Sequence, residues 1–305
     1  MKVLFVCSGN KNFGKPGVVV QNQANTLEKE GVEIEFFLIT QKGFIGYFKT
    51  IRSLIVKLRQ SQNKIIHSHY SLSSFVATMA LIFVKAKNVT HIVSLMGSDA
   101  QMTGWKKKLT LFFNDKYWNY TIVKSEEMAK ILGLKHFIVL PNGVDLESIK
   151  PNLSNPDNVI KKVLFAANPE RESKGYPLAK AAFELLNDDC IELEVKFNVP
   201  HQEIIQSINA CDVVLLSSKW EGSPNIIKEA MACNRPIVAT KVGDVPWLLA
   251  GVEGCYLVDQ DEQQVALAIQ KALKLKQSQG RNKIIELNLS AKQIAHKIIT
   301  LYNQN

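Results

Sequence analysis

The sequence predicts an α/β protein of two domains, each built on a doubly wound parallel sheet. Three observations lead to this prediction. Short apolar runs of the kind that buried parallel strands show alternate with helical stretches along the chain. A polar stretch from 151 to 158 interrupts the alternation and is typical of a linker. The 305 residues are enough for two domains of about 150 residues, each with its own core.

The first half of the chain predicts one such sheet. It opens with a continuous apolar run at 2–7, which leads through a polar loop into a helix. Parallel strands share an edge at their carboxyl ends, and ligands of such sheets bind there. The expected strands are 2–7, 33–39, 64–67, 90–95, 120–123 and 137–140, and the expected helices are 18–30, 46–60, 72–85, 106–114 and 126–132.

The second half predicts another sheet of the same kind. A new apolar run starts at 163, directly after the polar linker. The expected strands are 163–167, 192–197, 212–216, 236–240 and 255–258, the expected helices include 178–186, 201–209, 263–276 and about 290–302, and 242–246 is expected as a loop.

Composition indicates an ordinary globular protein, with 46% hydrophobic and 21% charged residues. The five cysteines are odd in number and scattered, which is typical of reduced cytosolic thiols, so a cytoplasmic location is expected. The longest apolar run, 75–84, is far shorter than the roughly 20 residues of a membrane span. The apolar start at 1–7 is likewise too short for a signal peptide.

Positive charge is concentrated in the first half. The net charge is +9, and residues 1–150 carry 20 Lys and Arg against 10 Asp and Glu. Such a surface suits anionic lipid or a phosphorylated acceptor, while the lack of zinc-finger spacing or an RNP-like motif argues against nucleic acid.

Helical stretches 46–60 and 105–113 mix lysines with aromatic residues. This pattern fits a solvated basic face over a packed apolar face, and it also fits a helix on an anionic membrane surface.

One stretch, 217–233, contains most of the residues with a predicted chemical role. An apolar strand ends at two serines, the chain turns through Gly222, and a helix is expected with Ser223 as its N-cap and Pro224 at its first position. The unpaired N–H groups of a helix start suit the phosphates of a nucleotide. Glu221 and Glu229 bracket this start, and carboxylates accept hydrogen bonds from sugar hydroxyls.

The spacing Glu221-x7-Glu229, together with Gly222, Pro224 and Ala230, resembles the signature of the retaining glycosyltransferases of family 4. The resemblance implies the GT-B fold, in which two Rossmann-like domains face each other across a cleft. It implies an acceptor-side domain at 1–152, joined by a C-terminal helix at about 288–305, and a nucleotide-sugar donor-binding domain at 153–287.

The activity that this resemblance implies is that of a hexosyltransferase-type enzyme. It would move a sugar from a nucleotide-sugar donor, with a UDP-sugar expected, to the hydroxyl of a saccharide or lipid-linked acceptor in surface polysaccharide or glycolipid assembly. No cofactor or metal is expected, because no D-x-D triplet stands in a suitable loop. Peripheral association with the inner face of the cell membrane is a further expectation.

The resemblance also assigns roles to residues on the donor side. The loop at 168–175 is similar to the family's Gly-Arg…Lys-Gly loop, so Lys174, with Arg171 nearby, is expected to neutralise the donor diphosphate. Glu229 would hold the ribose and Glu221 the transferred sugar. The remaining donor contacts are expected from Gly222, Ser223, Pro224 and Asn225.

In the first half, three segments resemble family motifs. The loop at 14–17 is similar to a glycine-rich loop that reaches the donor diphosphate, which places Gly17 in donor binding, although an ordinary strand-to-helix turn fits as well.

His69 lies in an Ile-His-x-His segment and is expected to face the cleft, with a packed histidine as the alternative. Met96 replaces the histidine of the family's His-Gly-Ser-Asp, so His69 is a candidate substitute. Asp99 fits that motif or a helix cap.

Two other functions on the same fold stay open at this stage. A non-catalytic GT-B subunit that partners another transferase is suggested by Met96 and by a short second domain. A sugar-nucleotide epimerase would need a further set of acid and base carboxylates.

Overall fold

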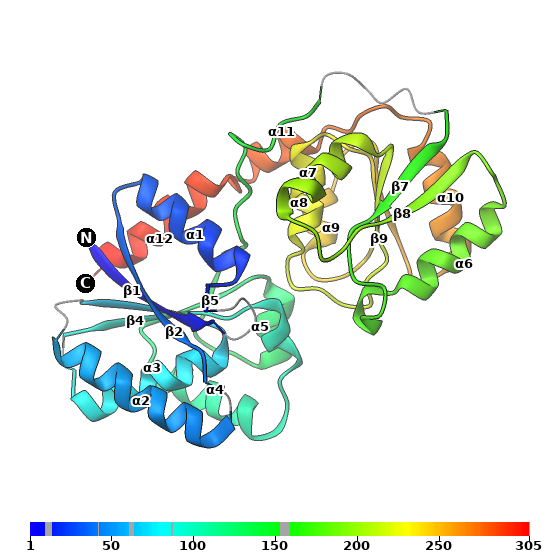
Figure 1. Ribbon diagram of the computed structural model, residues 1–305. Coiled ribbons are helices and arrows are strands. Elements are labelled where there is room, and N and C mark those ends of the chain that lie inside the picture. Colours follow the sequence, from blue (N-terminus) through cyan, green and yellow to red (C-terminus); the bar gives the residue numbers. More distant parts are fainter. Residues whose placement is uncertain (10–13, 42, 61–63, 87, 153–158, 305) are drawn as a thin grey trace. The chain divides into compact units, whose positions relative to one another are not determined.

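The computed structural model describes residues 1–9, 14–41, 43–60, 64–86, 88–152 and 159–304 (Figure 1). Residues 10–13 of the polar loop before the first helix, and most of the expected linker, 153–158, lie outside this range. The chain divides into two compact units. One comprises Met1–Gly143 with Ala291–Asn305, and the other comprises Val144–Ser290. Each unit holds one parallel sheet covered by helices, which confirms the predicted α/β class.

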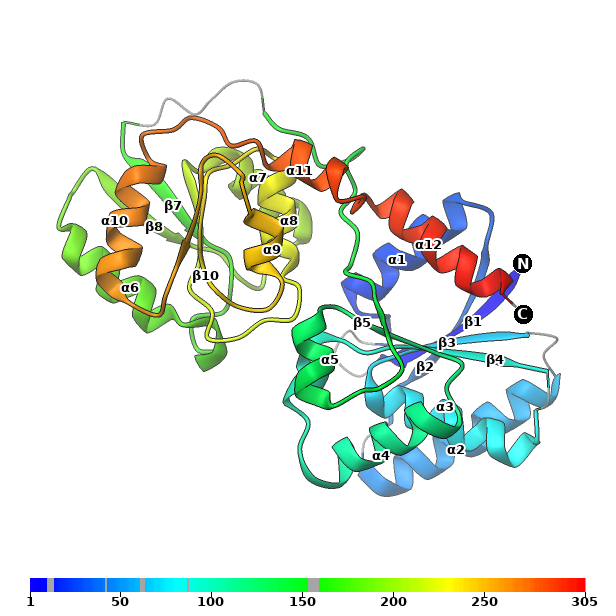
Figure 2. The same cartoon turned by 180° about the vertical axis from the view of Figure 1, so that it is seen from behind.

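The sheet of the first unit has six parallel strands in the order β2-β1-β3-β4-β5-β6. Helices α1 and α12 cover one face, and α2, α3 and α4 cover the other (Figures 1 and 2). The strands are β1 (Lys2–Ser8), β2 (Glu33–Ile39), β3 (Ile65–His69), β4 (Thr90–Ser94), β5 (Tyr120–Val123) and β6 (Ile138–Val139), and the α-helices are α1 (Val18–Lys29), α2 (Gly43–Gln60), α3 (Ser71–Val84), α4 (Gly104–Lys116), α5 (Glu126–Leu132) and α12 (Ala291–Asn303).

The last helix of the chain, α12, completes the first unit. Its apolar face, which includes Ile294 and Ile298, is buried, and it packs beside α1. The Tyr302 hydroxyl lies 2.7 Å from Nδ1 of His67 on β3. At the surface, Nε2 of His296 lies 2.6 Å from Glu30 Oε2. Residues from the two ends of the sequence therefore share one core.

The second unit has five parallel strands in the order β11-β10-β9-β7-β8. The chain runs from β7 outward to β8 and then returns to β9 on the other side of β7, so the strand order reverses between β7 and β9. The strands are β7 (Lys161–Phe165), β8 (Ile191–Val195), β9 (Val213–Leu216), β10 (Ile237–Thr240) and β11 (Cys255–Val258), and the α-helices are α6 (Tyr176–Leu186), α7 (His201–Ala210), α8 (Asn225–Ala232), α9 (Val245–Leu249), α10 (Glu262–Ala272) and α11 (Gly280–Glu286).

Two predictions about this unit are wrong in detail. Helix α8 begins at Asn225, so Ser223 is not its N-cap and Pro224 precedes its first position. The Ser223 hydroxyl instead accepts a hydrogen bond from Lys228 Nζ at 2.9 Å. The expected loop at 242–246 runs into the short helix α9. Proline at 246 is compatible with a helical first turn, because that position needs no intrahelical N–H bond.

Within the described ranges, no helix combines the length and the apolar character needed to cross a bilayer.

Candidate active site

The candidate site of the second unit lies where the strand order reverses, beyond the carboxyl ends of β7 and β9. In open α/β sheets, ligands bind at such a switch point. The loop after β7 and the loop after β9 are joined there by hydrogen bonds: Lys219 N donates to Ser173 O at 2.9 Å, and Ser217 Oγ donates to the carbonyls of Lys174 and Gly175 at 3.2 and 3.0 Å. The two loops therefore form a single surface.

Gly175 makes this close approach possible. Its φ is +66°, and a Cβ added at this position would lie 1.9 Å from Ser217 O. Only glycine tolerates both the left-handed backbone and the contact. The glycine that follows Lys174 thus has a steric reason in this chain.

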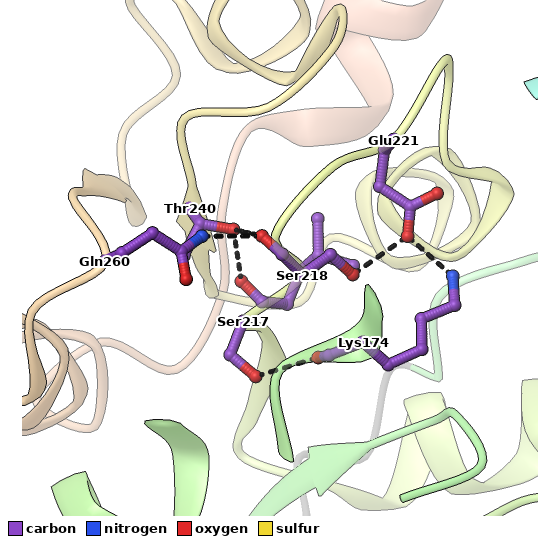
Figure 3. Close-up of polar contacts among 7 residues, drawn as sticks. Lys174, Ser217, Ser218, Glu221, Thr240 and Gln260 are labelled. Carbon is purple, nitrogen blue, oxygen red and sulfur yellow. Dashed lines mark hydrogen bonds and ion pairs between the residues drawn. The ribbon is translucent and has the colours of Figure 1, made fainter. Parts of the chain in front are cut away.

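Lys174 and Glu221 form the centre of the site (Figure 3). Lys174 Nζ lies 2.6 Å from Glu221 Oε1, and the Ser218 hydroxyl donates to the same oxygen at 2.8 Å. The two charged side chains are 21% and 13% exposed, so both are shielded from bulk water but reachable from one side. The structure thus brings together two residues that the sequence placed 47 positions apart.

The strand end beneath this pair is held by neighbouring elements. The carbonyl of Ser218 accepts hydrogen bonds from Thr240 Oγ1 and Gln260 Nε2, each at 2.7 Å (Figure 3). Thr240 ends β10, and Gln260 follows β11. The position of Ser218, and through it that of Glu221, is therefore fixed by three adjacent strands.

The turn from Glu221 into α8 packs against the 242–245 loop. Asp244 N donates to Gly222 O at 3.1 Å, and a Cβ on Gly243 would lie 2.5 Å from that same oxygen. Two buried charges lie beneath the turn. Burial lowers the pKa of Lys228 to about 8, against the attraction of Asp244 and Glu229. Burial also raises the pKa of Asp244 to about 6, against the attraction of Lys228.

Ser223 is held by this buried lysine, and Pro224 and Asn225 complete the start of α8. The first N–H groups of a helix have no intrahelical partner, and they carry the positive end of its dipole. This helix start lies four residues after Glu221, so one loop carries both the helix start and the carboxylate that pairs with Lys174.

Glu229 lies one helical turn into α8 and has a partner that sequence reasoning missed. Its Oε1 is 2.9 Å from Nε2 of His201, the first residue of α7. The Glu229 side chain is 14% exposed and the His201 side chain 39%. The hydrogen bond to Glu229 raises the pKa of His201. The only sequence signal for His201 is its place at a helix start shortly after β8, which neighbours β7.

Arg171 lies on the same loop as Lys174 but outside the Lys174–Glu221 network. Its residue is exposed, and its carbonyl accepts the Lys174 N–H at 2.8 Å. In the described contacts, the loop therefore presents Lys174 to Glu221 and leaves Arg171 at the surface.

The sequence also predicted two site residues in the first unit, His69 and Gly17. The His69 ring is wholly buried, with Nε2 3.0 Å from Gln23 Oε1 and the ring stacked on His67 at 4.4 Å between centres. The His69 ring is thus packed within the first unit. Gly17 precedes α1 with an extended backbone, and a Cβ there would meet no atom within 4 Å.

The segment that contains Met96 is also packed. Met96 is buried, and its N–H donates to Asp99 Oδ2 at 2.8 Å. The other oxygen of Asp99 accepts the Ser71 hydroxyl, also at 2.8 Å. Asp99 therefore caps the start of the 3₁₀ helix Gly97–Gln101 in which it lies, and not the start of the helix that follows. In the described part of the chain, no group of three His, Cys, Asp or Glu side chains is placed to hold a metal ion.

Solved structures with this fold span the whole chain. HepE from Anabaena in complex with UDP and glucose has a TM-score of 0.79 at 17% identity, with 100% of both chains covered. A glycosyltransferase from Rickettsia africae has a TM-score of 0.76 at 13% identity, with 99% of this chain and 98% of that chain covered. The predicted GT-B fold is thereby confirmed.

The second unit also matches a family. Residues 147–275 match the model of the family described as Glycosyl transferases group 1. The putative teichuronic acid biosynthesis glycosyltransferase TuaC of Bacillus subtilis is 23% identical over 70% of this chain and 62% of its own length. The amylovoran biosynthesis glycosyltransferase AmsK of Erwinia amylovora is 31% identical over 39% of this chain and 28% of its own length. The matches span less than two thirds of either relative.

Proposed function

We propose that the protein is a retaining glycosyltransferase of family 4 that moves a hexose from a UDP-sugar to an acceptor hydroxyl. The observation that carries this proposal is the Lys174–Glu221 pair at the switch point, directly before the start of α8. A cation, a carboxylate and a helix start at one place match the parts of a nucleotide-sugar: its diphosphate and its sugar hydroxyls. The UDP and glucose in the HepE complex support this choice of donor.

Charge stabilisation is the main chemical task of the site in this proposal. Departure of the sugar leaves negative charge on the diphosphate, and a preorganised cation stabilises that charge in the transition state. Lys174 would take this role together with the amides around Gly222, and Arg171 would add a second cation from the loop. Glu221, Ser223 and Asn225 would bind the sugar, and Glu229 the ribose. Retention would follow if the acceptor attacks the face that the diphosphate leaves.

Lys174 has a counter-ion within the protein. Its ammonium is paired with Glu221 at 2.6 Å. A bound diphosphate would share the ammonium, and the Glu221 carboxylate would then be able to accept a sugar hydroxyl. Donor binding thus exchanges one ion pair for another instead of burying an uncompensated charge.

A donor screen tests the proposal. We expect a UDP-sugar, among UDP-, GDP- and ADP-sugars, to raise the melting temperature and to release UDP in the presence of enzyme. Lys174→Met should remove both effects, whereas Lys219→Met, at a neighbouring exposed lysine paired with Glu172, should remove neither. Binding without UDP release would favour a non-catalytic partner subunit, and no response to any nucleotide-sugar would refute the proposal.

For the first unit, we propose an acceptor-side role at the cytoplasmic face of a membrane, on a saccharide or lipid-linked acceptor. The names of TuaC and AmsK place those relatives in polysaccharide biosynthesis. Phe48 on α2, and Trp105 and Phe112 on α4, are more than half exposed, and three lysines follow Trp105. Exposed aromatic residues beside lysines suit an anionic bilayer surface. Vesicles rich in phosphatidylglycerol should bind the protein at low salt, and failure to bind would remove the membrane from the proposal.

A further inference from the structure

We propose that His201 is a positioning residue for nucleotide binding, which holds Glu229 so that its carboxylate receives the ribose of the donor. This inference rests on the proposed function, because it assumes that Glu229 binds ribose. It adds a residue from α7, an element that no motif in the sequence connected with the donor.

The geometry directs one oxygen of Glu229 toward His201. Nε2 of His201 lies 2.9 Å from Oε1, a distance typical of a charge-assisted hydrogen bond. A glutamate side chain has three rotatable bonds, and a fixed Oε1 removes most of that freedom before the ligand arrives. Oε2 is then presented to a ribose hydroxyl at a lower entropic cost.

The placement of the pair supports a role in binding rather than in stability alone. Glu229 is on the helix whose start follows the Lys174–Glu221 pair, and its side chain is largely but not fully buried. His201 is more exposed and opens α7, which packs against α8 and β7. A hydrogen bond at such a depth is within reach of a ligand and is partly shielded from water.

Glu229 favours the imidazolium form of His201. The hydrogen bond to Glu229 raises the pKa of His201, with burial opposing it. Glu203 is in the first turn of α7 itself. On β7 the charged residues are Lys161, which pairs with Asp212 at 3.1 Å, and Lys162.

The pH dependence of nucleotide binding therefore has a predictable sign. The pKa of His201 in the pair lies above the usual histidine value of about 6.5. The charged hydrogen bond is therefore fully present below about pH 6.5, and it weakens as the pH rises through the raised pKa. Nucleotide affinity should fall over the same range. By linkage, a ligand that binds the protonated form more tightly must itself raise the pKa of His201.

Binding of UDP-glucose by isothermal titration calorimetry between about pH 5.5 and pH 8.5 tests the inference. Both phosphates of UDP-glucose are esterified, so the probe itself does not titrate in this range. We expect His201→Ala to weaken binding by about three- to five-fold at the acidic end. His201→Gln, which keeps an N–H donor, should retain most of the affinity and lose the pH dependence.

His296→Gln serves as the matched control, because it removes the other His–Glu pair of the described chain, with Glu30, in the first unit. It should bind UDP-glucose like the wild type at every pH. Nuclear magnetic resonance should show the pKa of His201 falling in Glu229→Gln and rising when UDP-glucose binds to the wild type.

The outcomes separate this inference from the proposed function. If His201→Ala binds UDP-glucose as tightly as the wild type does, or if the wild type binds it more tightly as pH rises, the role of His201 is overturned while the proposed function stays intact. Wild-type protein that binds no nucleotide-sugar would overturn both.

Discussion

At the scale of single residues, the site depends on two carboxylates of the same type in different surroundings. Glu221 has a lysine and a serine on one oxygen, whereas Glu229 has a histidine. Both carboxylates were predicted from their spacing, because a motif lies within a single stretch of sequence. His201 was missed because its contact joins two helices 28 positions apart, and no local pattern encodes such a pair.

These surroundings predict different effects for two alanine substitutions. Glu229→Ala should weaken UDP binding, since the proposed ribose contact is lost. Glu221→Ala should abolish turnover with UDP affinity largely intact, because it leaves Lys174 without its counter-ion and free to bind phosphate. Calorimetry with UDP and a sugar-transfer assay measure the two effects. Equal losses of affinity in both variants would contradict this division of roles.

At the scale of elements, the buried strands were predicted most accurately. Parallel strands covered on both faces read as continuous apolar runs, and β9, β10 and β11 fall within the predicted ranges. The short helices α9 and α11 were missed, and neither has a side-chain cap that marks its start. Helix α5, which is as short as α11, was predicted, and Ser125 caps its start. The start of α8 was misplaced because Ser223 bonds to Lys228, a contact that competes with capping.

The loop after β7 is expected to be sensitive to a single methyl group. Gly175→Ala places a Cβ against Ser217 O, whereas Gly251→Ala has the same left-handed backbone at φ +72° and no atom within 4 Å. Both should lose about 1 kcal/mol to backbone strain. Gly175→Ala should lose more stability than this, because its Cβ would clash with Ser217 O. It should also bind UDP-glucose poorly, because the loop must shift and Lys174 shifts with it. Urea denaturation and calorimetry would show the difference, and identical behaviour of the two variants would exclude the contact.

At the scale of the whole molecule, the predicted GT-B fold of two parallel sheets is confirmed. The alternation of strand and helix was sufficient to predict the two parallel sheets, whereas the GT-B fold was predicted from the resemblance of the motif at 217–233. The surroundings of His69 could not be predicted. A histidine at a strand end faces either solvent or core, and its burial here depends on Gln23 and Phe5 from other elements.

The first unit should lose stability in acid. His67, His69 and His91 are wholly or almost wholly buried. Burial lowers the pKa of His69 and His91 to about 3 and that of His67 well below its usual value. The unfolded chain takes up these protons below about pH 6.5 and the folded chain does not, so each histidine costs up to about 1.4 kcal/mol per pH unit as pH falls toward 3.

Urea denaturation at several pH values measures this slope. His91→Asn should reduce the slope between about pH 6 and pH 4, while His136→Asn, at an exposed position, should leave it unchanged. A slope that is insensitive to His91 would contradict the assignment.

The return of α12 to the first unit has a consequence for synthesis of the chain. Val144 and Ser290 pair as neighbours in a parallel bridge, so the second unit begins and ends at adjacent points. Because α12 follows the second unit in the sequence, every residue of the second unit is synthesised before α12. Until residues 291–303 have been made, His67 lacks Tyr302 and only α1 covers that face of the first sheet. The sheet that is translated first is thus the one whose folding finishes last.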